Sequence, residues 1–76
     1  MSRSRLTPIM EEVLRALEHG ELEHTPAVWR STAGVAGLWN SHTLSWLQHQ
    51  GYVRIRAGRA TIRAAGKLIL GMAVAA

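Results

Sequence analysis

Residues 52–63 read YVRIRAGRATIR, and apolar and charged side chains alternate along both halves of this stretch. Alternation with a period of two is typical of strands that bury one face, and residues 57–59 supply a turn that contains glycine. The stretch therefore predicts a short hairpin whose apolar face holds Val53, Ile55 and Ile62. The opposite, basic face is expected to hold Arg54, Arg56, Thr61 and Arg63, with Arg59 at the tip.

Two helices are expected in the N-terminal half, and a Thr-Pro pair marks the start of each. Threonine can accept a hydrogen bond from a free backbone N–H, and proline is well tolerated at the first helical position. After Thr7-Pro8, apolar residues follow helical spacing and predict a helix over about residues 8–19. Thr25-Pro26 repeats the signal and predicts a short second helix to about residue 33.

Two further helices are expected on either side of the hairpin. One opens at Leu38 or Asn40 and runs to about residue 50, where Gly51 ends it. The other covers residues 64–75 and is apolar nearly all round. Since a small core cannot cover every side of such a helix, part of it is a candidate surface for a second copy of the chain.

The composition bounds the domain organisation. Apolar residues make up 47% of the 76 residues, a globular rather than a disordered composition. A chain this short has room for a single domain, expected here over residues 1–76, with residues 1–6 as a flexible basic N-terminus.

The charges divide the chain into two parts. All five acids lie between residues 11 and 23, whereas residues 24–76 carry six arginines and lysines and no acid. A run of unopposed cations repels itself and favours a polyanionic partner, of which nucleic acid is the commonest.

Several function classes are not expected. The chain has no cysteine, which excludes thiolate nucleophiles and cysteine-based zinc sites. Its four histidines lack the spacing of a helical zinc pair, no glycine-rich phosphate loop is present, and no acid in residues 24–76 could orient a Ser–His pair. We therefore expect no enzyme, metal or cofactor. The longest apolar run, residues 68–76, is shorter than the ~20 residues that span a bilayer, so we expect a cytoplasmic protein without a membrane partner.

Three segments carry a resemblance to a known family: residues 25–34, residues 41–53 and residues 60–67. In their order and spacing they resemble the winged helix-turn-helix superfamily, most closely the small regulators of bacteria and phage. The third segment is similar to the end of the wing in MarR-type regulators. The likeness covers about residues 7–72. It implies a mainly α fold with a small β-hairpin: three helices, a two-stranded wing and a C-terminal helix.

The resemblance also implies a function, which is sequence-specific binding of double-stranded DNA by a transcriptional regulator. The helix at about residues 40–50 would enter the major groove, and the wing over residues 52–63 would contact phosphates or the minor groove. Because one small domain buries little DNA surface, a homodimer through the C-terminal helix is expected. The candidate DNA contacts are Arg30, Asn40, Ser41, His42, Thr43, Ser45, Trp46, Arg54, Arg56, Arg59 and Arg63.

Two alternatives remain open, and both depend on the tryptophans. Trp29 is expected in the core, while Trp39 and Trp46 lie seven apart on the predicted third helix and should be buried or exposed together. If exposed, they could belong to a winged-helix module that binds an acidic protein, such as a phage-encoded inhibitor of a host factor. Beside the wing, they could instead stack on single-stranded nucleic acid.

Overall fold

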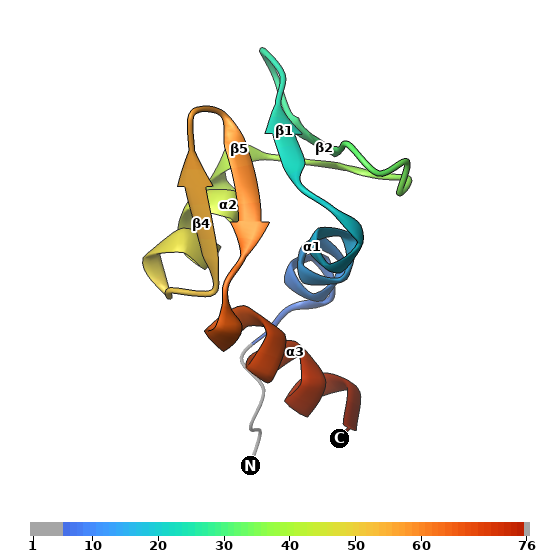
Figure 1. The fold of residues 1–76 in the computed structure, drawn as a ribbon, viewed down its shortest axis with the longest axis vertical. Coiled ribbons are helices and arrows are strands. Elements are labelled where there is room, and N and C mark those ends of the chain that lie inside the picture. The colour runs from blue at the N-terminus through green and yellow to red at the C-terminus, as the bar shows by residue number, and fades with distance from the viewer. Residues whose placement is uncertain (1–5, 76) are drawn as a thin grey trace.

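The computed structural model describes residues 6–75, and the side chains of residues 6–72. This part of the chain contains three helices and five strands (Figure 1). In chain order they are α1 (Pro8–His19), β1 (Leu22–His24), β2 (Trp29–Ser31), β3 (Leu38–Trp39), α2 (Ser41–His49), β4 (Val53–Arg56), β5 (Arg59–Ile62) and α3 (Ala64–Ala75).

The five strands form one antiparallel sheet in the order β3-β2-β1-β5-β4. The central strand β1 pairs with β2 on one side and with β5 on the other, so that Leu22 lies opposite both Ser31 and Ala60. At the tip of the hairpin, the backbone N–H of His24 donates to the carbonyl of Gly58 at 2.8 Å. The predicted wing is therefore not a free ribbon, because it continues a larger sheet.

The predicted fold class, mainly α with a two-stranded wing, is wrong: the protein is a mixed α/β fold. The difference arises at residues 27–33, where a helix was predicted and β2 is found. Thr25 does not cap a helix there. Its hydroxyl donates to the carbonyl of Val28 at 2.7 Å, and its backbone N–H donates to the same carbonyl at 2.8 Å, which closes a turn. The chain then returns along β1, and no helix lies between α1 and α2 in the described residues.

The other predicted elements are confirmed. Helix α1 covers residues 8–19, and the Thr7 hydroxyl accepts from the backbone N–H of Met10 at 3.2 Å as its N-cap. Strands β4 and β5 form the predicted hairpin. Its turn residues Ala57 and Gly58 have φ values of 52° and 76°, and a left-handed pair of this kind matches the twist of the flanking strands. Helix α3 begins at residue 64, as predicted.

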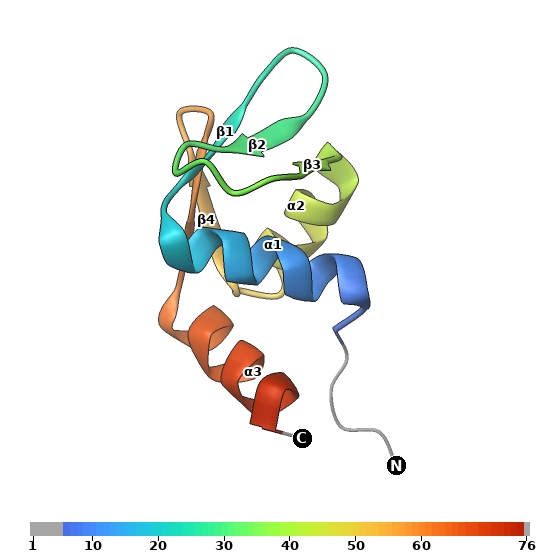
Figure 2. The ribbon, with the colours of Figure 1, turned by 90° about the vertical axis from the view of Figure 1, so that its right-hand side faces the viewer.

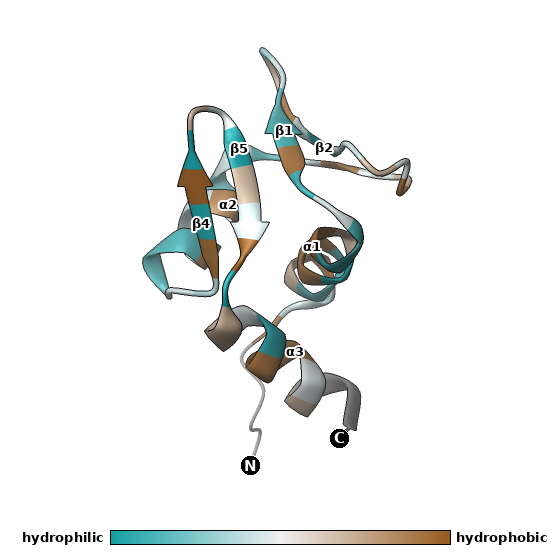
Figure 3. Ribbon diagram, in the orientation of Figure 1, coloured by the Kyte–Doolittle hydropathy of each residue, from teal (hydrophilic) through white to brown (hydrophobic). Residues whose placement is uncertain are grey.

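The core lies between the helices and one face of the sheet (Figure 2). Alternation within the strands sends every second side chain into it, which appears along β4 as successive brown and teal bands (Figure 3). The largest fully buried side chains come from α1, β1, α2 and β4, and they are Leu14, Leu22, Leu44, Leu47, Val13 and Val53.

Helix α3 packs on α1, with Leu70 buried and Ile69 half-buried against the core. Its approach is close at Gly66, where an added Cβ would lie 2.2 Å from the carbonyl oxygen of Tyr52. On its outer side, Leu68 and Met72 are 68% and 57% exposed. No helix of the described residues combines the length and apolar content needed to cross a bilayer.

The two glycines of α3 provide a test of this packing. We expect Gly66→Ala to destabilise the protein by about 2 kcal/mol or more, because the new methyl group would overlap backbone that cannot move away freely. Gly71→Ala is the control: nothing lies within 4 Å of its added Cβ, so the gain in helix propensity should stabilise by about 0.5 to 1 kcal/mol. Urea unfolding followed by circular dichroism measures both, and equal effects would contradict the packing described.

Candidate nucleic-acid interface

The register of the sheet brings arginines from three strands to one face. Residues that lie opposite each other in an antiparallel pair point to the same side. Arg30 on β2 lies opposite Glu23, Glu23 lies opposite Arg59 on β5, and Arg59 lies opposite Arg56 on β4. We call this side the open sheet face; its members are Leu38, Arg30, Glu23, Arg59, Arg56, Arg54 and Thr61.

Solvent reaches the open sheet face, whereas the helices cover the opposite one. All of its members are exposed except Glu23, which is half-buried. The opposite face carries the side chains that enter the core, among them Trp29, Leu22 and Ala60. The predicted basic face of the hairpin is thus the edge of a wider surface, to which β2 adds Arg30.

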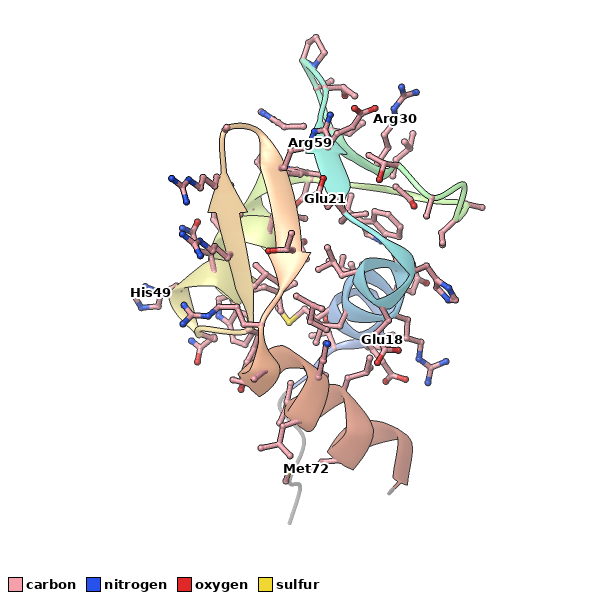
Figure 4. All side chains as sticks on the ribbon, in the orientation of Figure 1. Glu18, Glu21, Arg30, His49, Arg59 and Met72 are labelled. Carbon is pink, nitrogen blue, oxygen red and sulfur yellow. The ribbon has the colours of Figure 1, made fainter. Side chains whose placement is uncertain are left out.

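Glu23 on β1 and Glu21 just before it form ion pairs with two of these four arginines. Arg30 Nε lies 2.7 Å from Glu23 Oε2, and Arg59 Nη1 lies 2.9 Å from Glu21 Oε1. Figure 4 shows Arg59 and Glu21 beside each other at the upper end of the sheet. The expectation that the cations of residues 24–76 are unopposed therefore fails at these two positions, because the sheet brings residues 21–23 alongside them.

The remaining cations lie on β4, at the end of β5 and in the first turn of α3. Arg54 and Arg56 project from β4, an edge strand, and neither has an acidic partner within residues 6–72. Arg63 follows β5, where its backbone N–H donates to the Tyr52 carbonyl at 2.9 Å. Lys67 follows one helical turn later and is exposed, as Arg63 is. These four form the unpaired basic group: Arg54, Arg56, Arg63 and Lys67.

The predicted contact residues on α2 lie on the other side of the sheet from Arg54 and Arg56. Helix α2 packs through Leu44 and Leu47 into the core, on the covered side of the sheet. Arg54 and Arg56 project from the other side. The two parts of the predicted site therefore lie on different sides of the sheet, and His49, the last residue of α2, lies beside β4 (Figure 4).

Several of these α2 side chains already have structural partners. Asn40 Oδ1 accepts from the backbone N–H of Thr43 at 2.8 Å and from its hydroxyl at 3.0 Å. The Ser41 hydroxyl lies 3.3 Å from His24 Nε2. Trp46 is half-buried, and its ring lies 6.4 Å from that of Tyr52. His42 and Ser45 are exposed.

The tryptophans do not form a stacking surface for single strands. Trp29 is in the core as predicted. Trp39 belongs to β3 and not to α2, so the prediction that it shares a helical face with Trp46 is wrong. It is 5% exposed, and its indole N–H donates to Glu12 Oε1 at 3.3 Å. The open sheet face carries no aromatic side chain among the described residues.

The surface beside Trp39 is hollowed, but the hollow is small. An open hollow of about 190 Å³ lies beside Trp39 and is lined in part by Glu12, Arg15 and His19. Ligand pockets usually enclose about 300 Å³ or more. Within residues 6–75, no three His, Asp or Glu side chains gather as a metal ion would require.

Glu21 and Glu23 are the site residues that sequence reasoning missed. Residues 21–24 read ELEH and lie between the first two predicted helices, although Glu-Leu-Glu alternates polar and apolar side chains as a strand does. A strand of three residues is too short for an alternation with a period of two to be recognised in the sequence. Only pairing with β2 and β5 makes the pattern evident.

Comparisons with models of protein families, with characterised proteins and with solved structures found no match for this chain. The resemblance to the winged helix-turn-helix superfamily therefore stays a prediction.

The capping role of Asn40 gives a testable prediction. Asn40→Ala should destabilise the protein by about 1 kcal/mol, because the backbone N–H of Thr43 at the start of α2 loses its acceptor. The matched control is Ser45→Ala on the same helix, where the exposed hydroxyl forms no hydrogen bond within the described residues. Chemical unfolding measures both variants. Equal stability of the two would contradict the capping role.

Proposed function

We propose that this protein binds double-stranded DNA through the open sheet face, as a small DNA-binding regulator of transcription would. One observation carries the proposal: arginines from β2, β4 and β5 share an uncovered face, and two of them, Arg54 and Arg56, have no acidic partner among the described residues. Guanidinium groups bind phosphate oxygens and can also read guanine edges in a bidentate manner.

The shape and chemistry of this face favour a duplex over a single strand. Antiparallel strands can lie in a duplex groove, and a positively charged face neutralises its phosphates. Recognition of single strands relies instead on exposed aromatic rings, and here Trp29 and Trp39 are buried. Arg63 and Lys67 would extend the phosphate contacts beyond β4.

An acidic protein partner is the second candidate, favoured by one observation. Strand β4, which carries Arg54 and Arg56, pairs only with β5 in the described sheet, so no strand pairs with its outer edge. An extended acidic segment could add there as a further strand. In a competition assay, polyglutamate would displace labelled duplex DNA from the protein. Displacement as strong as that by unlabelled duplex DNA of equal charge would support this candidate.

A second copy of the chain would give a DNA-binding unit two half-sites. The exposed side of α3 supports this proposal, because Leu68 and Met72 lie one helical turn apart and are both largely exposed. Sedimentation at increasing concentration should show dimers that Leu68→Lys removes. A monomer at all concentrations would contradict the dimer, not the DNA contact.

The DNA proposal predicts a loss of DNA affinity that depends on which arginine is removed. Arg54→Ala combined with Arg56→Ala should weaken binding to a short duplex and make the slope of log K against log salt shallower by about 2. The unpaired basic group predicts a slope between about −3 and −4 for the unmodified protein. Fluorescence anisotropy across a salt series measures both quantities.

Arg15→Ala is the control, because Arg15 is exposed on α1, on the helical side of the core, and pairs with Glu11. It should reduce affinity far less, even when compared with the single Arg54→Ala variant. Failure of the unmodified protein to bind duplex at low salt would overturn the proposed function. So would equal losses in Arg15→Ala and in Arg54→Ala.

A further inference from the structure

The two ion pairs of the open sheet face occupy its middle. Strand β1, the third of the five strands, lies between β2 and β5. Glu23 on β1 and Glu21 just before it reach arginines on both sides. Glu23 contacts Arg30 on β2, while Glu21 contacts Arg59 on β5. The unpaired cations lie to one side, at β4 and at the start of α3.

Both pairs are open to solvent. The side chains of Arg30 and Arg59 are 58% and 52% exposed, and those of Glu23 and Glu21 are 29% and 45% exposed. Exposed pairs of this kind hold together weakly, because water and salt screen the attraction. A phosphate can therefore approach the same guanidinium groups, whose planar fork accepts carboxylate and phosphate alike.

The carboxylates thus compete with any phosphate that reaches these arginines. Each acid offers its arginine a negatively charged oxygen at hydrogen-bond distance without any cost of bringing two molecules together. Each acid also repels a phosphate that comes near. Both effects act against binding in the middle of the face and are weaker at β4, which lies two strands away from β1.

We propose that Glu21 and Glu23 are specificity-determining residues that hold Arg59 and Arg30 and so confine phosphate binding to the β4 side of the sheet. This inference rests on the proposed function. It names residues that restrict the contact, whereas the proposed function names those that make it.

The chain offers a matched control for this inference. Glu18 is exposed on α1 and has no ion-pair partner within the described residues. Figure 4 shows it on the helix, well away from the Arg59–Glu21 pair. Glu18→Gln therefore changes the net charge as much as Glu21→Gln or Glu23→Gln does, but releases no arginine.

The first experiment measures duplex binding by fluorescence anisotropy at several salt concentrations. Glu21→Gln and Glu23→Gln should each bind about five- to tenfold more tightly, with a slope steeper by about 1, because each frees one arginine for a phosphate. Glu18→Gln should change affinity less than about twofold, through the overall charge alone. The inference is overturned if neither Glu21→Gln nor Glu23→Gln exceeds the control.

A double-mutant cycle tests whether the effect passes through the arginine. Arg59→Ala should reduce affinity little in the unmodified protein, but about five- to tenfold in the Glu21→Gln background. Arg30→Ala and Glu23→Gln form an independent second cycle, should one variant fail to fold, and circular dichroism melting checks each fold. Equal losses in both backgrounds would overturn the inference.

The outcomes separate the two proposals. If Arg54→Ala with Arg56→Ala weakens binding as predicted while the glutamine variants match Glu18→Gln, the DNA-binding face stands and the role of the acids fails. If the unmodified protein and all glutamine variants fail to bind duplex at low salt, the proposed function fails and this inference fails with it.

Discussion

The antiparallel register imposes the constraint on which the functional surface depends. Opposite residues in such a pair must point to the same side, so placing Leu22 and Trp29 in the core forces their neighbours Glu23 and Arg30 outward. Because β1 also pairs with β5, the same constraint applies to the hairpin, where Ala60 is buried and Arg59 is exposed. Burial of one face thus arranges the arginines of the other, although Arg30 and Arg59 are far apart in sequence.

The same constraint gives the surface an uneven charge. Glu23 must share a face with Arg30 and Arg59, and Glu21 reaches Arg59 from the residue before β1. The middle of the sheet is therefore close to neutral, while β4 and the start of α3 remain basic. A surface with this distribution favours a ligand that follows β4 over one that covers the whole sheet.

Sequence reasoning succeeded where the signal was long and local. Helix α1, the β4–β5 hairpin and its basic face were predictable from spacing and from the Thr7 cap. It failed at β1, β2 and β3, which have two or three residues each and are stabilised by pairing with one another and with β5. The same Thr-Pro pair begins a helix at Thr7-Pro8 and a turn at Thr25-Pro26. Tertiary contacts determine which of the two structures forms. The ion pairs of Glu21 and Glu23 could not be predicted without those strands.

The central claim is that the open sheet face, on its β4 side, contacts duplex DNA. An ¹⁵N–¹H NMR titration with a short duplex tests it most directly, since every backbone amide reports on its own surroundings. The account predicts that the largest shifts fall on residues 54–56 and 61–67, with small shifts at Glu12 and Glu18 of α1. Shifts concentrated on α1 or on residues 41–45 of α2, or no shifts at low salt, would contradict it.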